Sequence, residues 1–310
     1  MSKTTVGIVG AGSIGLSFAL VFARAGGKVR LYDPDAEARG RVAEEITARV
    51  DNLAQAGLLS LTATAILAQI MVVADLADLV SGCELVLECV PERLALKQAI
   101  FAELDALAPA SVILASASSA LMASQFAADL AGRARCLVAH PGNPPHLIPV
   151  VEVVPAPFTD AAVVARLVEL LHSVDQVPIR LNKEIEGFVF NRLQGAVLRE
   201  AYCLVRDGVV SVADLDKVMH SGLGLRWAAI GPFETVDLNT RGGIAQHALN
   251  MGPAYARMGQ QRGQNDPWTP ELVATVAAER RRLLPLADWD SRGRWRDQML
   301  MRIIKAKGGH

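Results

Sequence analysis

Gly10-Ala11-Gly12-Ser13-Ile14-Gly15 decides the fold, because this stretch lies between an apolar β-branched run at Thr5–Val9 and a segment with the composition of a helix. Gly26-Gly27 ends that segment, and a second strand-like run, Lys28–Tyr32, leads to Asp33. Strand, glycine-rich turn, helix and strand in this order predict a βαβ unit that binds a dinucleotide.

The turn suits a dinucleotide for physical reasons. Gly10 permits the tight turn, Gly12 lets the backbone approach the pyrophosphate, and Gly15 lets helix and strand pack closely. Ser13 and Ile14 begin a helix whose free N–H groups and dipole favour an anion. All five are therefore candidate cofactor-binding residues.

Asp33 completes the candidate cofactor site at the end of the second strand. Its carboxylate is expected to accept hydrogen bonds from the hydroxyl groups of the adenosine ribose. Pro34 and Asp35 follow and offer no cation for a 2′-phosphate, so the sequence predicts NAD, rather than NADP, as the cofactor.

Five more apolar runs predict further strands, with helix-like segments such as Glu92–Leu107 between several of them. The runs are Ile70–Val73, Glu84–Cys89, Ser111–Ala115, Cys136–Ala139 and Pro149–Val154. Continuous apolar strands with crossover helices predict an α/β fold of Rossmann type, a doubly wound and mostly parallel sheet covered on both faces. Residues 36–67, broken at Gly57, are predicted as an inserted helical hairpin that serves either as a packing element or as a substrate lid.

The pattern becomes helical from Ile185 onward, where apolar residues recur at three- and four-residue spacing. Ser211 and Asp214 match a capping box at the start of one such helix. Residues 270–284 and 293–307 also have helical patterns, and no strand pattern is visible after residue 180.

Two domains are expected from the change of pattern near Lys183. Residues 1–183 form an NAD-binding Rossmann domain, and residues 184–310 form an all-helical domain for substrate binding and dimerisation. The amphipathic helices hold more apolar surface than one small domain needs, which suits either a homodimer interface or contact with the other domain.

Composition excludes several classes of function. Acidic and basic residues are interspersed and the formal net charge is −1, so neither nucleic-acid binding nor a basic membrane-binding face is indicated. The four cysteines lack metal-ligand spacing, so no metal site is expected, and they suit a reducing compartment. The N-terminus is polar, and the uncharged stretch 106–128 is interrupted by Pro109 and several serines. We therefore expect a cytoplasmic protein without a signal peptide or a membrane span.

A histidine and a glutamate on neighbouring predicted strands carry the candidate chemistry. His140 ends one strand within Ala139–Pro145, and Glu152 lies on the next strand after a proline-rich turn. Beside a dinucleotide site, such a pair can move a proton while a hydride is transferred.

Several motifs occur in the order that is found in a known family. They are the G-x-G-x-x-G turn, Cys89-Val90-Pro91-Glu92, the S-x-S-S stretch at 116–119, H-P-x-N-P at 140–144, Glu152, and Gly187–Leu193. Together they resemble the 3-hydroxyacyl-CoA dehydrogenase superfamily over nearly the whole chain. Gly222–Trp227 and Ile230–Thr235 are similar to its lambda-crystallin and L-gulonate 3-dehydrogenase branch.

The resemblance implies catalytic roles by position. His140 matches the general base that takes the proton of the 3-hydroxyl group, and Glu152 matches the carboxylate that orients this histidine. Ser119 matches the serine that hydrogen-bonds the reacting oxygen. Asn191 matches an amide that helps to hold the substrate or the histidine.

The resemblance also extends the cofactor site. Glu92 and Lys97 match positions near the nicotinamide ribose, and Asn143 is expected to shape the turn near the nicotinamide.

The charges of the hairpin favour a small free acid over an acyl-CoA as the substrate. Arg39, Arg41 and Arg49 are the only cations within residues 36–67, and residues 50–80 contain no Lys or Arg. The phosphates of CoA call for more positive charge than this.

Arg226 is a candidate clamp for the carboxylate of such an acid, because a guanidinium can bind a carboxylate bidentately. The alternative role for Arg226 is a structural ion pair with Glu234 or Asp237.

The sequence therefore predicts an NAD-dependent enzyme that oxidises the 3-hydroxyl group of a small 3-hydroxy acid, in the manner of L-gulonate 3-dehydrogenase. The alternative among enzymes is a 3-hydroxyacyl-CoA dehydrogenase. A third reading is a non-catalytic NAD(H)-binding protein of crystallin type. The joint presence of Ser119, His140, Glu152 and Asn191 argues against this third reading.

Overall fold

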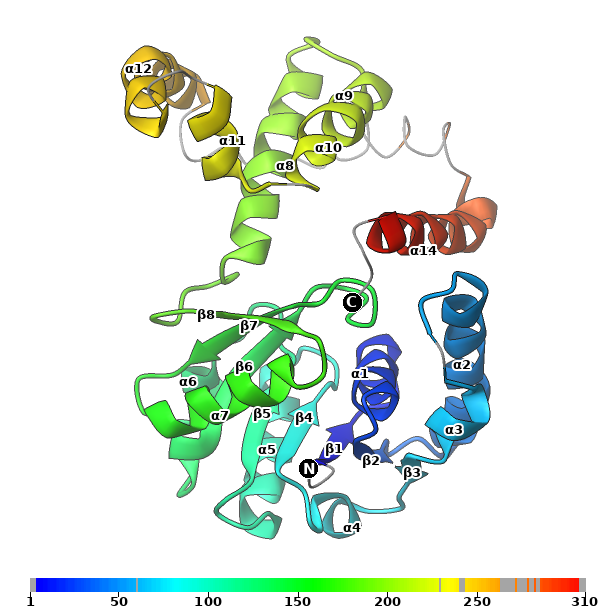
Figure 1. Cartoon of the computed structure of the whole chain (residues 1–310). Helices are drawn as coiled ribbons and strands as arrows, with labels where there is room; N and C mark the ends of the chain where they lie inside the picture. Colours follow the sequence, from blue (N-terminus) through cyan, green and yellow to red (C-terminus); the bar gives the residue numbers. More distant parts are fainter. Residues whose placement is uncertain are drawn as a thin grey trace. The chain divides into compact units, whose positions relative to one another are not determined.

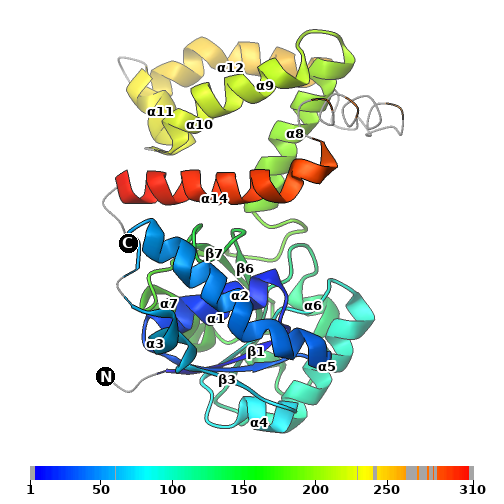
Figure 2. The same cartoon turned by 90° about the vertical axis from the view of Figure 1, so that its right-hand side faces the viewer.

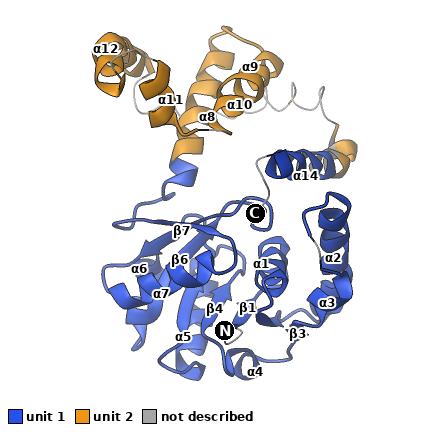
Figure 3. Cartoon of the chain, viewed as in Figure 1, with its two compact units in different colours: residues 1–192, 294–310 blue, residues 193–293 orange. Residues whose placement is uncertain are grey.

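The computed structural model describes residues 4–59, 61–228, 230–239, 243–262 and 285–306, together with the single positions 271, 278 and 282. The chain divides into two compact units (Figure 3). The first unit comprises residues 1–192 and 294–310, and the second comprises residues 193–293. The segment 294–310 thus groups with the first unit, whereas the helical domain expected from the sequence included it.

An eight-stranded sheet forms the centre of the first unit (Figure 1). Its strands lie in the order β3-β2-β1-β4-β5-β6-β7-β8, and all neighbours are parallel except the antiparallel pair of β6 and β7. The predicted doubly wound, mostly parallel sheet is therefore confirmed. The strands are β1 Thr5–Val9, β2 Lys28–Tyr32, β3 Ile70–Val72, β4 Leu85–Glu88, β5 Ile113–Ser116, β6 Cys136–Pro141, β7 Val150–Pro155 and β8 Val177–Arg180.

The strand β8 was not expected from the sequence. It pairs with β7 alone at the edge of the sheet, and most of its residues are exposed. It contains Pro178, which cannot donate a hydrogen bond to a strand ladder and is tolerated at an edge. An exposed edge strand lacks the buried apolar pattern by which the other strands were predicted.

Helices cover both faces of the sheet and enclose two hydrophobic cores (Figure 2). One core includes residues of α1 Ser13–Arg24, α2 Ala36–Gln55, α3 Ala63–Leu67 and α7 Ala161–His172. The other includes residues of α4 Leu76–Val80, α5 Leu94–Leu107 and α6 Ala123–Phe126. Every residue of α1 from Gly15 to Ala23 is buried, which explains why this helix is apolar on all sides.

The segment predicted as a helical hairpin forms α2 and α3 and packs into the core that contains α1. Asp35 caps α2 by accepting a hydrogen bond from the backbone N–H of Glu37. One stripe of α2 is buried at three- and four-residue spacing, and it consists of Val42, Ile46, Val50 and Leu53. This burial makes α2 a packing element of the first unit.

Helices also make up the described part of the second unit. They include α8 Phe190–Arg206, which begins in the first unit, α9 Val212–Val218, α10 Gly224–Trp227, α11 Pro232–Asn239 and α12 Gly243–Arg262. Ser211 accepts a hydrogen bond from the backbone N–H of Asp214 at 3.1 Å, so the predicted cap of α9 is confirmed. The predicted helix at 270–284 lies almost entirely outside the described residues.

The last helix, α14 (Trp289–Ala306), adds its C-terminal half to the first unit. Met301 is 4% exposed and belongs to the core that contains α1 and α2. Ile304 lies one turn later and packs against the same core. Ile303 points away and is 43% exposed.

The burial of Met301 predicts that α14 stabilises the first unit. Met301→Ala should lower the free energy of unfolding by about 2–5 kcal/mol, because a buried methionine is replaced by a cavity. Ile303→Ala is the matched control on the same helix and should cost only about 0.5 kcal/mol. Urea denaturation followed by circular dichroism measures both. Equal losses for the two variants would show that α14 is not anchored through Met301.

Candidate active site

The glycine-rich turn has the geometry that was expected of it. Gly10 has a φ of 107°, a conformation that favours glycine, and its N–H donates to the carbonyl of Tyr32 at 2.7 Å. A Cβ atom at Gly15 would lie 1.9 Å from the carbonyl oxygen of Gly10. Only glycine therefore allows α1 to start this close to β1.

The first turn of α1 is open to a ligand. Gly12 is its N-cap residue and provides no side-chain hydrogen bond to the helix. A Cβ atom at Gly12 would meet no atom within 4 Å, and Ser13 is exposed. The N–H groups of this turn, which include that of Ile14, can therefore meet a pyrophosphate directly. The residues fit the phosphates of a dinucleotide.

Asp33 is held beside this turn by hydrogen bonds to the backbone. Its Oδ2 accepts from the N–H of Ala11 at 2.7 Å, and its Oδ1 accepts from the N–H of Asp35 at 2.9 Å. Arg39 donates to the carbonyl oxygen of Asp33 at 2.5 Å. Arg39 lies one turn into α2, and nothing in the sequence indicated that it reaches back to the end of β2.

A buried ion pair lies beneath the ends of β4 and β5. The Nζ of Lys97 on α5 donates to both carboxylate oxygens of Glu88, at 2.9 and 2.8 Å, and to the Oγ of Ser116 at 3.2 Å. The side chains of Lys97 and Glu88 are 1% and 0% exposed. The hydroxyl of Ser116 donates to Glu88 at 2.6 Å and accepts from the N–H of Ser118 at 3.2 Å. Lys97 thus fixes Ser116 at the end of β5, and the hydroxyl of Ser116 in turn holds the backbone of Ser118 in the loop that follows.

Glu92 holds the same loop from the other side. Its Oε1 accepts from the hydroxyl of Ser118 and from the backbone N–H groups of Ser119 at 3.0 Å, Ala120 at 2.7 Å and Leu121 at 2.9 Å. Partial burial acts to raise the pKa of the Glu92 carboxyl. The hydrogen bonds from Ser118, Leu121 and Ala120 outweigh this effect and lower the pKa below its usual value. The carboxylate is therefore ionised at neutral pH.

His140 and Glu152 face each other across the antiparallel strands β6 and β7, in direct register. Nδ1 of His140 lies 2.7 Å from Oε2 of Glu152, and the two side chains are 7% and 3% exposed. Nε2 of His140 has no hydrogen-bond partner in the described part of the chain. The ring packs against Phe188, with centroids 5.5 Å apart, and edge-on against Phe190 at 6.4 Å.

The other oxygen of Glu152 binds the start of α8. Its Oε1 accepts from the backbone N–H groups of Val189 at 2.7 Å and Phe190 at 2.9 Å. Burial acts to raise the pKa of the Glu152 carboxyl. The hydrogen bonds from His140, Phe190 and Val189 outweigh it, and the pKa is lower than usual. Glu152 therefore stays ionised beside His140.

Asn191 connects this pair to the loop after β5. Its Nδ2 donates to the carbonyl oxygen of Ser119 at 2.9 Å. Hydrogen bonds and adjacent backbone thus run without a break from His140 through Glu152 to Asn191 and Ser119. The structure therefore brings together the four residues for which a catalytic role was predicted. The Ser119 hydroxyl has no hydrogen-bond partner among the residues that the structure describes.

Asn143 and Arg226 were also predicted as site residues, but within the described residues neither forms a hydrogen bond with His140, Glu152 or Asn191. Asn143 is exposed in the loop between β6 and β7, where it precedes Pro144 in a cis peptide bond. Arg226 is exposed on α10 in the second unit. Within the described ranges it forms no ion pair with Glu234 or Asp237, so the structural alternative for Arg226 finds no support.

Glu88 and Ser116 are site-supporting residues whose partnership the sequence did not show. A signal was available, because Glu88 is the one acid that ends an otherwise apolar strand and a buried carboxylate needs a partner. The side chain that supplies the partner, Lys97, comes from the next helix. Its distance from Glu88 depends on how that helix returns to the sheet.

Other kinds of site are not indicated in the described residues. No group of three or more His, Cys, Asp or Glu side chains there could hold a metal ion, and none of the described helices is long and apolar enough to cross a membrane. Cys83, Cys89 and Cys136 are free thiols.

Comparison with protein families gives two matches that cover most of the chain. Residues 5–185 match the NAD-binding domain of 3-hydroxyacyl-CoA dehydrogenase, and residues 187–284 match its C-terminal domain. The chain belongs to the 3-hydroxyacyl-CoA dehydrogenase superfamily. The first unit therefore contains an NAD-binding domain, as the fit of the glycine-rich turn indicates.

Relatives within this superfamily narrow the branch. The chain is 41% identical to lambda-crystallin of Oryctolagus cuniculus, over 97% of this chain and 95% of the relative. It is 36% identical to a 3-hydroxyacyl-CoA dehydrogenase of Gibberella moniliformis, over 98% and 94% of the two chains. The predicted membership of the lambda-crystallin branch is confirmed.

A solved structure of similar architecture is that of 5-formyl-3-hydroxy-2-methylpyridine 4-carboxylic acid 5-dehydrogenase, an NAD⁺-dependent dismutase. It superimposes with a TM-score of 0.85 at 26% identity, over 99% of this chain and 100% of that chain. The relatives that are named as dehydrogenases differ in the substrate that their names give, so the comparisons define the class of reaction more closely than the substrate.

The buried ion pair generates a prediction about positioning. Lys97→Met should lower the free energy of unfolding by about 3–5 kcal/mol, because it leaves the charge of Glu88 buried without a partner. It should also weaken NAD binding, since the loop at 118–121 loses the hydrogen bonds that connect it to Lys97 through Ser116. Unfolding by urea and a fluorescence titration with NADH measure the two effects.

Two controls separate this effect from the loss of a charge. Glu88→Gln combined with Lys97→Met should restore most of the stability, because no buried charge remains. Lys217→Met removes an exposed partner of Asp214 and should leave the stability close to that of the wild type. A Lys97→Met protein as stable as the wild type would show that the buried pair does not support this site.

Proposed function

We propose that the protein oxidises the 3-hydroxyl group of a small 3-hydroxy acid with NAD⁺, and that His140 is the general base. The observation that carries the proposal is the buried His140–Glu152 pair, with Nδ1 of the histidine 2.7 Å from the carboxylate and Nε2 left without a protein partner in the described residues. This arrangement prepares one ring nitrogen to take a proton from a substrate.

Glu152 sets the state of the histidine. A carboxylate that accepts from Nδ1–H selects the tautomer with a free lone pair on Nε2 and stabilises the imidazolium that forms after proton transfer. The backbone N–H groups of Val189 and Phe190 keep the carboxylate ionised and fixed. The proton of the substrate hydroxyl therefore moves to Nε2 of His140, while Glu152 remains charged.

Ser119 and Asn191 hold the reacting oxygen in this proposal. The free hydroxyl of Ser119 can donate to the oxygen as it becomes a carbonyl. Asn191 binds the backbone of Ser119 and positions that hydroxyl. The cofactor-side roles of Glu92, Lys97 and Asn143 also belong to the proposal. For Glu92 and Lys97, the support is that both hold the loop that carries Ser119.

Bound NAD⁺ supplies the acceptor for the hydride that leaves C3 of the substrate. The open first turn of α1 would hold the pyrophosphate, with Asp33 at the adenosine ribose. The substrate loses one hydride and one proton, and a 3-oxo acid is formed.

The state of the hairpin cations supports a free acid as the substrate. Arg39 donates to backbone carbonyl groups, Arg41 pairs with Glu37 at 3.8 Å, and Arg49 pairs with Glu45 at 2.9 Å. These three arginines are therefore already engaged and offer little to the phosphates of CoA. Arg226, which has no ion-pair partner in the described residues, remains the proposed clamp for the substrate carboxylate.

A 3-hydroxyacyl-CoA dehydrogenase is the second candidate, and one observation favours it. Helix α14 brings Arg302 and Lys305 beside Asn52 and Gln55 of α2, around a cavity of about 390 Å³. Two cations at the end of the hairpin increase the positive charge available to a polyphosphate. The hairpin sequence alone did not contain them.

A homodimer formed through the helical domain is also part of the proposal. Several large apolar side chains of the second unit are exposed, among them Phe233 at 77%, Leu249 at 72% and Leu225 at 68%. Apolar surface of this kind is typical of an interface. A reducing, cytoplasmic location suits the free thiols of Cys83, Cys89 and Cys136.

A comparison of substrates tests the proposed function. Formation of NADH is followed by absorbance with L-gulonate, 3-hydroxybutyrate and carnitine as free acids, and with 3-hydroxybutyryl-CoA and a longer acyl-CoA as thioesters. We expect turnover of at least one free acid and little of the thioesters. Turnover confined to the thioesters would establish the second candidate. NADH binding without turnover of any of these compounds would support a non-catalytic protein.

The role of His140 has its own prediction. His140→Gln should lower kcat by about 10²–10⁴-fold, the range of general acid–base catalysis, while NADH binding stays close to that of the wild type. His172→Gln is the matched control, because His172 is exposed in the last turn of α7. Steady-state kinetics and NADH titration measure both. A His140→Gln enzyme with most of its activity would remove His140 from the mechanism.

A further inference from the structure

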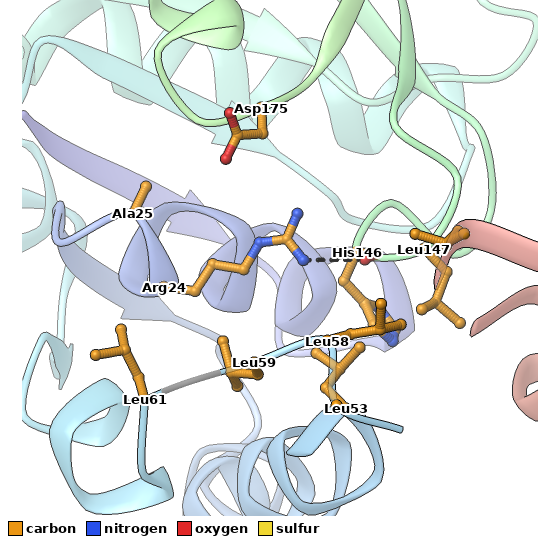
Figure 4. Close-up of a pocket in the computed structure, with 11 residues that line it drawn as sticks. Arg24, Ala25, Leu53, Leu58, Leu59, Leu61, His146, Leu147 and Asp175 are labelled. Carbon is orange, nitrogen blue, oxygen red and sulfur yellow. Dashed lines mark hydrogen bonds between the residues drawn. The ribbon is translucent and has the colours of Figure 1, made fainter. Parts of the chain in front are cut away.

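A pocket of about 570 Å³ opens in the first unit, apart from the residues of the candidate active site. Its walls come from the end of α1, the segment between α2 and α3, the loop between β6 and β7, the turn before β8, and α14 (Figure 4). Pockets of this size commonly hold small organic molecules. The lining residues on which its chemistry depends are Arg24, His146, Asp175 and a group of leucines.

Arg24 is the polar group that a ligand would meet. It lies partly buried at the end of α1, and Nη1 donates to the carbonyl oxygen of His146 at 3.2 Å. Among the described residues this is its one hydrogen bond, and no carboxylate lies within ion-pair distance of it. Burial lowers the pKa of the Arg24 guanidinium, and the charge of Asp175 opposes that effect. Most N–H donors of Arg24 are therefore available to a ligand. A guanidinium in this state favours an anion, which can accept two of these hydrogen bonds at once.

The other titratable groups leave the pocket suited to a negative charge. Asp175 is the single acid among the described residues that line it, and its carboxylate lies across from Arg24 in Figure 4. His146 is neutral at physiological pH, because burial and then the charges of Arg49 and Arg24 lower its pKa to about 3. The Nζ of Lys305 lies close to Gly57, one of the lining residues, and adds a cation near the pocket.

The rest of the wall is aliphatic. Leu58 and Leu59 are half-buried, Leu147 is 4% exposed, and Ile304 of α14 closes the wall beside them. Figure 4 shows Leu53, Leu58, Leu59 and Leu61 on one side of the Arg24 guanidinium and Asp175 on the opposite side. A ligand with one anionic end and an apolar body would match both parts.

We propose that this pocket binds an aliphatic monocarboxylate, whose carboxylate pairs bidentately with Arg24 while its chain lies on Leu58, Leu59 and Ile304. The site is separate from the His140 pair, and the proposal does not depend on the proposed function. Its head group would compete with the carbonyl of His146 for Arg24. His146 belongs to the loop that leads from His140, so an occupied pocket is linked by a short stretch of backbone to the candidate active site.

Calorimetric titration of the full chain with sodium octanoate, below the concentration at which it forms micelles, tests the proposal. We expect saturable binding at one site. Arg24→Met should weaken it at least about tenfold, since a charge-assisted bidentate pair is lost. Arg41→Met is the matched control, because Arg41 lies on an exposed face of α2 outside the pocket, and it should bind like the wild type.

A second variant acts in the opposite direction and keeps the test decisive if Arg24→Met does not fold. Asp175→Asn removes the acid that lies across from Arg24, and it should tighten octanoate binding several-fold. Octanol has the same chain without the charge and should bind much more weakly than octanoate. The proposal is overturned if the wild type does not bind octanoate, if Asp175→Asn weakens binding, or if octanol binds equally well.

Binding in the candidate active site is a separate outcome. Octanoate could bind Arg24→Met with wild-type affinity and be displaced by a 3-hydroxy acid that the enzyme oxidises. This result would locate octanoate at the catalytic centre and would overturn the proposal. Loss of octanoate binding in Arg24→Met with unchanged kinetics toward the substrate would support it. These results distinguish failure of the pocket from failure of the proposed function.

Discussion

The site depends on one buried carboxylate, that of Glu152, because each of its two oxygens binds a different part of the chain. Glu152 gives one oxygen to Nδ1 of His140 and the other to the N–H groups of Val189 and Phe190. It therefore orients the histidine and anchors the start of α8 at the same time. A buried carboxylate without these partners would be costly, so the sheet and this segment of chain must meet where Glu152 lies.

A second buried carboxylate, that of Glu88 at the end of β4, has a comparable role. Glu88 is fully buried and is neutralised by Lys97, while Ser116 completes its hydrogen bonds. Buried ion pairs of this kind contribute little net stability, because desolvation offsets the attraction. Their effect here is geometric, since strand β4, helix α5 and the loop that carries Ser119 are held in one arrangement.

The cations on and beside helix α2 fall into two groups with different surroundings. The arginines of α2 are engaged by neighbouring acids and carbonyl groups, whereas Arg302 and Lys305 of α14 lie around a cavity at the end of the same helix. The C-terminal helix therefore alters the electrostatics of the hairpin that it packs on. An account of substrate choice based on α2 alone is incomplete, because part of the relevant charge comes from the other end of the chain.

Local sequence determined the glycine-rich turn, the run of buried strands, the cap at Ser211 and the placement of His140 and Glu152 on adjacent strands. Periodicity, turn residues and capping act between near neighbours in the chain, so they can be read directly. Tertiary structure alone decided that Lys97 reaches Glu88, that Glu152 binds the start of α8, and that Met301 packs beside α1 and α2. The partners of Glu152 and Met301 lie far away in the sequence, whereas Lys97 follows Glu88 by nine residues. In each case the contact depends on how a helix returns to the sheet. The exposed strand β8 escaped prediction for the opposite reason, because it has little buried apolar surface from which a pattern could arise.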